Sequence, residues 1–300
     1  MVPSELAYAG GGAHTPPARR SRRPPPAAPD ITRIAPPGGV QPLNLIELWR
    51  YRQLIYCFAR RDLQLRYRQT LAGVAWVAMQ PLLSAFVFTI FFGHWLRVSS
   101  SGVPYVVFAF CGILPWSYFV HVVTVSTNSV VNQRALVTKV WFPRITLPFS
   151  PALAGLVDLV VSFGFLVGLM WYYRMVPHLS VLAVPIFLGM AIATAIAVGL
   201  WLSALDVWYR DVAQALPFFM QLWFFATPVA YSPEVVPAGW RWLYRLNPMV
   251  GVVDGLRWSL LGTERLDVGA IATSAAAMLC ILVGGLYFYR AREGEFADVI

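Results

Sequence analysis

Lysine is almost absent from this sequence of 300 residues: Lys139 is the only one, and a valine follows it. A phosphate-binding P-loop ends in Gly-Lys-Ser or Gly-Lys-Thr, so the sequence lacks that type of ATP site. Histidine and cysteine are also scarce, with four and three residues, and neither shows the spacing of a metal site or of a disulfide framework. The sequence therefore indicates no cofactor, no metal and no catalytic residue within this chain.

Charge is the second shortage, because only 12% of the residues are charged while 58% are hydrophobic and the mean hydropathy is +0.61. A soluble chain of this length needs far more polar surface, so the composition predicts an all-α polytopic membrane protein. The net charge of +9 would suit a nucleic-acid partner, but the cations flank apolar runs and do not form a basic face. Orientation in a membrane explains them better, and we expect no nucleic-acid partner.

The N-terminal residues, 1–42, are rich in proline and arginine and poor in aliphatic side chains. Such a segment cannot bury enough apolar surface to fold, so we expect a disordered tail. Its basic run is not followed by an apolar core and a cleavage site, so it is not a secretory signal and should stay in the cytoplasm.

Residues 43–70 have the pattern of an amphipathic helix lying at a membrane interface, with apolar side chains at helical spacing and arginines on the other side. Asn44 and Glu47 form a capping-box pattern at its start. Asp62 and Arg66, four residues apart, are expected to pair on its surface.

Six uncharged or nearly uncharged runs follow, and each is long enough for a helix to cross a hydrocarbon core of about 30 Å or close to it. They predict a six-span domain over residues 71–289 and a cytoplasmic C-terminal tail at 290–300. Most of the 23 Lys and Arg residues then fall on the same side as both termini, which predicts that this side is cytoplasmic. The six runs cover residues 71–96, 105–131, 147–173, 181–205, 212–230 and 268–289.

The link between the second and third spans, 135–151, sets Lys139 and Arg144 among apolar and aromatic side chains such as Trp141 and Phe142. A short amphipathic helix at a membrane surface has this pattern. The link is either a docking helix that transmits force from a soluble partner or a positively charged loop that only fixes the topology.

The connection between the fifth and sixth spans, 231–267, is the longest, and it contains helix stop signals at Pro237, Gly239 and Asn247-Pro248. These signals separate two short amphipathic pieces, each too short to span a membrane. We expect external re-entrant half-helices that cap the outer end of the bundle, or an interfacial hairpin with only a packing role.

Ionisable residues at membrane depth are costly unless they face protein or water. Asp158, in the third span, either lines a polar conduit or is protonated and bonded to a neighbouring helix. Asp206, Arg210 and Asp211 gather at the end of the fourth span, where the first two are expected to pair. This group is either a hinge that anchors a moving helix or a salt-bridged turn.

Aromatic residues make up 15% of the chain. Four phenylalanines lie deep in the first span, where they either pack in the core or offer their ring faces to the apolar faces of sugars: Phe86, Phe88, Phe91 and Phe92. Others lie near predicted interfaces and suit an aromatic belt: Trp95, Trp116, Trp171, Tyr172, Tyr173, Trp240 and Trp242.

Four short motifs occur in a recognisable order along the chain. They are Lys-Val-Trp-Phe-Pro-Arg in the first cytoplasmic loop, Trp-Tyr-Arg-Asp-Val in the second, Asn-Pro in the external segment and Glu-Phe-Ala-Asp-Val-Ile at the C-terminal end. Together with the N-terminal helix and the six spans, this order resembles the type-2 ABC permeases that export polysaccharides, of the O-antigen and teichoic-acid type. The resemblance covers roughly residues 43–300.

The resemblance implies a homodimer of this subunit in the bacterial cytoplasmic (inner) membrane, bound to two ABC ATPase subunits that carry ATP and Mg²⁺. It implies a lipid-linked glycan as substrate, moved through a channel between the two copies. By position, it implies ATPase coupling for Lys139, Trp141, Phe142, Pro143, Arg144, Trp49, Arg52 and Arg61. The inner hinge, if the cluster at the end of the fourth span is one, consists of Asp206, Tyr209, Arg210 and Asp211. The resemblance implies an outer gate, for which the candidates are Pro233, Glu234, Asn247, Pro248, Asp254 and Arg257. The candidates for lining the channel, from their own chemistry, are Phe86, Phe88, Phe91, Phe92 and Asp158.

The predicted function is that of the membrane subunit of an ATP-driven exporter of lipid-linked polysaccharide, which is a transporter and not an enzyme. Two alternatives stay open. One is a type-2 permease for a drug or a small lipid, with the same fold and partner. The other is a membrane-embedded transferase acting on lipid-linked sugars, for which Asp206, Arg210 and Asp211 are the only serious acid or base candidates.

Overall fold

The computed structural model describes residues 49–67, 74–96, 98, 100, 102–176, 179–262 and 266–300. Within these ranges every regular element is a helix, which confirms the predicted all-α class. The predicted tail, 1–42, and the capping pattern at Asn44 and Glu47 lie outside the described residues.

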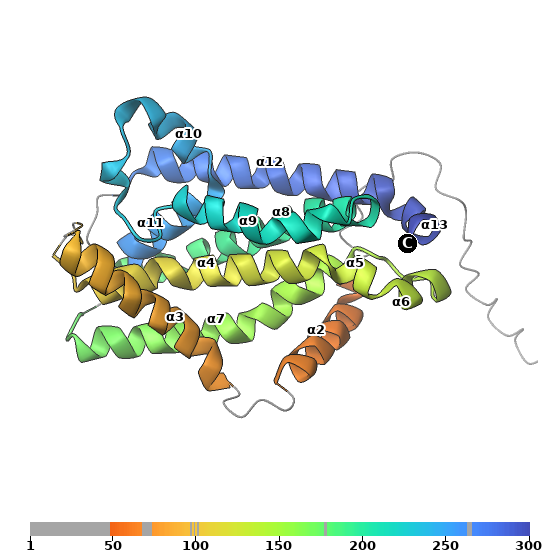
Figure 1. Cartoon of the computed structure of the whole chain (residues 1–300), viewed down its shortest axis with the longest axis horizontal. Helices are drawn as coiled ribbons and strands as arrows, with labels where there is room; N and C mark the ends of the chain where they lie inside the picture. The colour runs from red at the N-terminus through yellow and green to blue at the C-terminus, as the bar shows by residue number, and fades with distance from the viewer. Residues whose placement is uncertain are drawn as a thin grey trace, which may run out of the picture. The chain divides into compact units, whose positions relative to one another are not determined.

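The longer helices are α2 (Arg52–Tyr67), α3 (Val74–Phe88), α4 (Tyr105–Thr127), α7 (Thr146–Tyr172), α8 (Val184–Trp208), α9 (Asp211–Phe225), α11 (Pro248–Leu261) and α12 (Val268–Arg292) (Figure 1). The shorter α-helices are α5 (Ser129–Asn132), α6 (Arg134–Lys139), α10 (Arg241–Arg245) and α13 (Phe296–Val299). A π-helical stretch, Thr89–Trp95, continues α3. Short 3-10 turns occur at Leu179–Ala183, Pro233–Val235, Ala238–Trp240 and Glu293–Glu295.

Four helical stretches in the described part are long and apolar enough to cross a membrane: Tyr105–Thr127, Thr146–Tyr172, Leu179–Trp208 and Val268–Val299. They lie at the places predicted for the second, third, fourth and sixth spans. The first predicted span is described from Val74 onward, as α3 and the π-helical stretch. The fifth corresponds to α9, which has 15 residues and ends at Phe225, before the predicted limit.

α4 lies at the centre of the packed helices. Its sequence is apolar on all sides, and a helix with this composition is normally buried all round. It packs against α3, α7, α8, α9 and α11, and Phe108, Phe110 and Phe119 have no exposed surface. α4 therefore fixes the positions of the helices that carry the predicted functional residues.

α11 packs very close to α8. At Gly255 an added Cβ would lie 2.1 Å from a ring carbon of Phe187, a separation that real side chains do not show. Glycine at this position allows the two helices to approach, and most of α11 is buried as a result.

α5, α6 and α13 lie together at one end of the long helices, and α10 lies beside the start of α12 at the other (Figure 1). A cluster of buried apolar side chains, here called the loop cluster, lies at the end that carries α5, α6 and α13. It joins α2, the loop after α6, the end of α8 and the C-terminal residues. Its members are Phe58, Val130, Val137, Phe142, Ile145, Leu147, Leu200, Ala204, Val207, Leu286, Tyr289 and Phe296.

Candidate functional site

The loop between α6 and α7 is the segment for which docking was predicted, and only its first part is helical. α6 ends at Lys139, Val140 is extended (φ −129°, ψ 133°), and α7 begins at Thr146. Lys139 and Val140 are exposed, and 60% of the Trp141 surface is accessible. The loop tip, defined as residues 139–141, thus presents an exposed cation and two exposed apolar side chains.

Two predicted docking residues face inward. Phe142 is only 8% exposed, and the centroid of its ring lies 6.0 Å from that of Phe58 on α2. Pro143 is buried next to it. Arg61, also on α2, donates a hydrogen bond to Gln133 Oε1 (3.2 Å) just before α6. These contacts attach the loop to α2, so the buried Phe142 and Pro143 anchor the residues next to the exposed tip.

Of the two other residues predicted to contact the same partner, Arg52 is the first residue of α2 and Trp49 lies just before that helix. Both are exposed, and the Arg52 guanidinium lies 4.9 Å from the centroid of the Trp49 ring, in a cation–π contact. They form an exposed basic and aromatic pair at the N-terminal end of the helix to which the loop is attached.

The residues after α12 hold the other side of the loop. Oε1 of Glu293 accepts a hydrogen bond from the Arg144 backbone N–H (2.5 Å), and the Arg144 guanidinium donates to the Glu293 carbonyl oxygen. The Tyr289 hydroxyl donates to the Arg144 carbonyl oxygen (2.9 Å). Phe296 is fully buried, with its ring centroid 5.5 Å from that of Trp208. The predicted C-terminal tail therefore packs against the loop and the end of α8.

The predicted inner hinge lies where α8 gives way to α9. The helix stops before Tyr209, so the spacing of Asp206 and Arg210 no longer places them on one helical face, and no ion pair forms between these two described residues. Asp206 is buried, and its Oδ1 accepts a hydrogen bond from the Ala213 N–H (3.3 Å) in the first turn of α9. Tyr209, Arg210 and Asp211 are exposed. The carboxylate thus fastens α9 to α8.

Asp158, near the middle of α7, is held by α2. Its two carboxylate oxygens accept hydrogen bonds from Arg66 and Tyr67, the last two residues of α2 before the described range ends. Arg66 Nη1 also lies 2.8 Å from Nε2 of His121 on α4. Of the two interpretations from sequence, the bond to a neighbouring helix is present, and it includes an ion pair. The group ties three helices together.

The pairing of Arg66 with Asp158 leaves Asp62 to another partner. The predicted pair of Asp62 with Arg66 is wrong, because Asp62 pairs with the adjacent Arg61 (2.9 Å). Burial, and after it the hydrogen bond to Asp158, raises the pKa of Tyr67 to about 12. The hydroxyl therefore stays protonated at neutral pH and remains a donor to Asp158.

Asn247 stands between the two helices of the predicted outer gate, α10 and α11. Its Oδ1 accepts hydrogen bonds from an N–H in the first turn of α11 (3.0 Å) and from Trp223 Nε1 (3.0 Å). Its amide donates to the Ala226 carbonyl oxygen (3.1 Å) and to Thr227 Oγ1 (2.9 Å). Pro248 follows at the first helical position, where its missing N–H is not needed. Asn247 therefore caps α11 and ties it to the end of α9.

Arg257 lies on α11 and has no exposed surface. Its guanidinium donates to the carbonyl oxygens of Val229 (2.7 Å) and Tyr231 (3.1 Å) and lies 3.6 Å from the ring centroid of Phe108. Asp254, one turn earlier on the same helix, is partly buried. Arg257 thus binds the backbone that follows α9 and fixes its path across α4.

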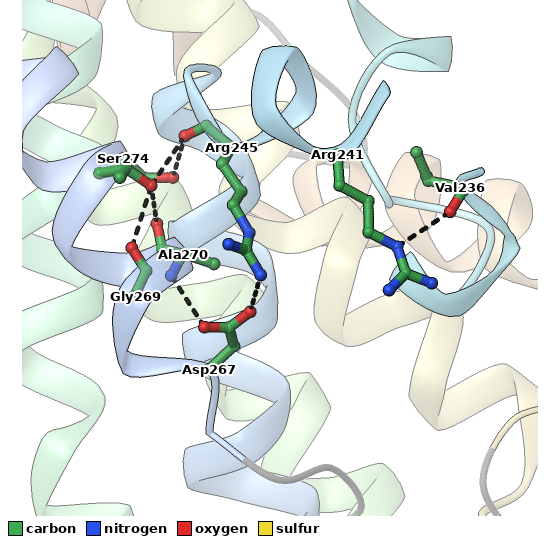
Figure 2. A network of polar contacts seen from close by, with 8 residues as sticks. Val236, Arg241, Arg245, Asp267, Gly269, Ala270 and Ser274 are labelled. Carbon is green, nitrogen blue, oxygen red and sulfur yellow. Dashed lines mark hydrogen bonds and ion pairs between the residues drawn. The ribbon is translucent and has the colours of Figure 1, made fainter. Parts of the chain in front are cut away.

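Figure 2 shows how α10 is fastened to the start of α12. Arg245 Nη2 lies 2.5 Å from Asp267 Oδ2, and the other oxygen of that carboxylate accepts an N–H in the first turn of α12 (3.0 Å). Ser274 donates to the Arg245 carbonyl oxygen (3.0 Å), and Arg241 donates to the Val236 carbonyl oxygen (3.1 Å). α10 is therefore attached to α12 through its C-terminal residue.

Two of the predicted belt residues are exposed here: Trp240, just before α10, and Trp242, within it. Pro233 opens a 3-10 turn before α10, and the side chain of Glu234 lies outside the described part of the chain. Trp116 lies in the core instead of a belt, because it is buried against Phe119 and α9.

The phenylalanines predicted to line a channel divide into two sets. Phe86 and Phe91 are exposed, whereas Phe88 and Phe92 are partly buried and lie 5.6 Å apart between ring centroids. Phe88 also lies 5.6 Å from Phe224 of α9. The exposed apolar side chains of α9 are Phe218, Phe219, Leu222 and Phe225. Two helices that touch each other thus both carry an exposed aromatic face.

The partners of Asp158 and Arg144 were not predicted from the sequence. A carboxylate inside an apolar span is costly unless it has a partner, but nothing in the sequence distinguished Arg66 from the other arginines that precede the first span. For Arg144, the available signal was the C-terminal motif, which begins two residues after Glu293.

Helices of this length and apolarity, packed round a buried central helix, define a multi-pass membrane protein. Residues 52–261 match the family described as ABC-2 type transporter. The chain belongs to the ABC-2 type transporter family, which confirms the family resemblance found in the sequence.

Several relatives match over most of this chain. The O-antigen export system permease protein RfbA of Myxococcus xanthus is 28% identical over 256 residues, which are 85% of this chain and 98% of that protein. Two proteins of the same name from Klebsiella pneumoniae are 26% and 25% identical over 251 residues, each covering 82% of this chain and 95% of the relative.

Proposed function

We infer that this chain is the permease subunit of an ABC exporter for polysaccharide, and that its substrate is a lipid-linked glycan of the O-antigen type. The observation that carries this conclusion is the extent of the match. Permeases named for O-antigen export align over 95% or more of their own length. Similarity over a whole subunit supports a shared task better than similarity over one pair of helices.

The partner that drives transport is an ABC ATPase, as family membership implies. The chain has no P-loop, so ATP and Mg²⁺ are bound by that partner and this subunit does no hydrolysis of its own. Two permease subunits and two ATPase subunits make the complete exporter in this proposal.

The loop tip is the surface we assign to the ATPase, together with Trp49 and Arg52 at the N-terminal end of α2. All of these residues are exposed at the end of the molecule that carries the loop cluster. Phe142 packs on α2 and Arg144 binds the C-terminal residues, so a push on the tip reaches α2 and α12 at once. The inner hinge is the turn at Tyr209, where Asp206 ties α9 to α8.

The subunit has six spans in this proposal, with α3 and its π-helical continuation as the first and α9 as the fifth. The exposed aromatic faces of these two helices, which include Phe86, Phe91 and Phe219, lie between the two copies of the homodimer and line the glycan path. Aromatic rings suit that path because they stack on the apolar faces of sugars and bind no single sugar tightly.

The loop cluster and both termini lie on the cytoplasmic side of the bacterial inner membrane. The distribution of Lys and Arg supports this orientation, because most of them fall on that side. α10 and α11 then lie at the outer face as half-helices of a gate, with Asn247 and Arg257 holding them against α9.

Replacement of Trp141 by alanine tests the proposal in proteoliposomes that contain the permease and its ATPase. Trp171→Ala is the matched control, because Trp171 is also exposed but lies at the other end of α7. We expect Trp141→Ala to abolish most glycan export and most substrate-stimulated ATP hydrolysis, while Trp171→Ala retains both. Equal activity of the two variants, or glycan export by the permease with no ATPase present, would contradict the assignment.

A further inference from the structure

We propose that the C-terminal residues 289–296 position the loop tip for the ATPase, and that Glu293 is the positioning residue through which they act. This inference rests on the proposed function. It adds a part of the chain for which that function alone requires no role.

The contact between Glu293 and Arg144 is reciprocal. The Glu293 side chain accepts the Arg144 N–H (2.5 Å), and the Arg144 side chain donates to the Glu293 backbone. Tyr289, which is fully buried, adds a bond from its hydroxyl to the Arg144 carbonyl oxygen (2.9 Å). Arg144 is therefore bound through its N–H, its carbonyl and its side chain by residues about 145 positions away in the sequence.

The loop needs such external support because it has little structure of its own. The extended conformation of Val140 ends α6, and α7 begins only at Thr146. Two attachments fix the residues between them: Phe142 against Phe58, and Arg144 against Glu293. Loss of the second attachment would free one side of the loop while the buried helices stay packed.

The C-terminal residues are themselves firmly held. Phe296 has no exposed surface, and its ring lies 5.2 Å from that of Tyr289 and 5.5 Å from that of Trp208, measured between centroids. Arg290 supports Glu293 through Oε2 (3.4 Å), and both of these side chains are mostly buried. The Glu293 carboxylate thus accepts hydrogen bonds from the Arg144 backbone N–H and from the Arg290 guanidinium. Hydrogen bonds to a charged acceptor are stronger than neutral ones.

The arrangement also links the loop tip to the hinge at the end of α8, because Trp208 contacts Phe296. A displacement of the tip by the ATPase therefore reaches the turn between α8 and α9 through Arg144, Tyr289 and Phe296. Glu293 supports this route because it also binds Arg144.

The test uses the full permease with its ATPase in proteoliposomes and titrates the ATPase. Glu293→Ala removes both the carboxylate acceptor and its charge. We expect it to raise the ATPase concentration that gives half-maximal glycan export about tenfold, which is the effect of one lost charge-assisted hydrogen bond. Glu293→Gln keeps an acceptor oxygen for the Arg144 N–H, and its effect should be intermediate. Glu295→Gln is the matched control, because Glu295 is exposed and pairs only with Arg292 (3.2 Å) among the described residues; it should match the wild type.

Two further comparisons separate the possible outcomes. If the ATPase does not stimulate glycan export by the wild-type permease at all, the proposed function fails. If it does, and Glu293→Ala needs the same ATPase concentration as the wild type, only the positioning role is overturned. Should Glu293→Ala prove too unstable to purify, Tyr289→Phe removes only the hydroxyl that donates to Arg144 and should shift the titration in the same direction by less. A normal titration for both Tyr289→Phe and Glu293→Gln would also overturn the positioning role.

Discussion

Replacement of Arg257 by methionine removes the only cation buried within α11 while keeping a side chain of similar length. The variant loses the hydrogen bonds to the carbonyl oxygens of Val229 and Tyr231 and the contact with the Phe108 ring. A hydrogen bond from a charged donor contributes about 1.5–3 kcal/mol, so two of them contribute roughly 3–6 kcal/mol. Part of this is offset because the guanidinium no longer has to be buried, and we expect a net loss of about 3 kcal/mol.

The assay is thermal unfolding of the detergent-purified protein, followed by tryptophan fluorescence. A loss of about 3 kcal/mol should lower the Tm by roughly 6–12 °C for a chain of this size. Arg241→Met is the control, because Arg241 is exposed and donates only one hydrogen bond, to Val236 (3.1 Å); its Tm should change by about 2 °C or less. If both variants lower the Tm equally, the carbonyl contacts of Arg257 do not stabilise the segment after α9, and the reasoning is refuted.

Two other predictions concern helix packing. Gly255→Ala should lower the free energy of unfolding by about 1–3 kcal/mol, because the added Cβ would overlap the Phe187 ring. Gly164→Ala is the control and should leave the Tm unchanged, because nothing lies within 4 Å of the added carbon. Equal Tm values for the two variants would show that α11 and α8 are not so close. Asp158→Asn and Arg66→Gln should each lower the Tm, and the double variant should lose less than the sum of the two by about 1 kcal/mol, because both remove one ion pair. Additive losses in that double-mutant cycle would mean that the pair contributes nothing to stability.

The long spans could be predicted because hydropathy is a property of the sequence alone. The prediction for residues 105–131 begins at the residue where α4 begins, and that for 147–173 lies within a residue of α7 at each end. The fifth span was placed too far along, to residue 230, because Val229 and Ala230 are as apolar as the helix before them. They are buried, but they are not helical. Hydropathy reports burial and does not report where a helix ends.

The partners of the charged residues could not be predicted in the same way. The four-residue spacing of Asp62 and Arg66 permits a pair on an isolated helix, yet a carboxylate on another helix, Asp158, holds Arg66 instead. The same spacing failed for Asp206, because the helix stops within the interval. Spacing describes one helix, whereas these partners are set by the packing of several helices.

In the loop between α6 and α7, the sequence pattern indicated a functional segment, but the packing determines which of its residues are exposed. Its basic and aromatic composition predicted a functional segment, but composition does not distinguish Trp141, which is exposed, from Phe142, which is buried. That distinction depends on Phe58, more than 80 residues earlier in the chain.

The number of residues in the π-helical stretch after α3 determines how the side chains before and after it are oriented relative to each other. The Leu96 N–H bonds to the Phe91 carbonyl oxygen, five residues back, where an α-helix would use the fourth. Deleting one residue from Thr89–Trp95 would therefore restore ordinary winding and rotate everything on one side of the cut by about 100° relative to the other. Phe86 and Trp95 would then point in new directions relative to each other. Deletion of a single codon there would therefore change the orientation of these exposed aromatic side chains without removing either of them.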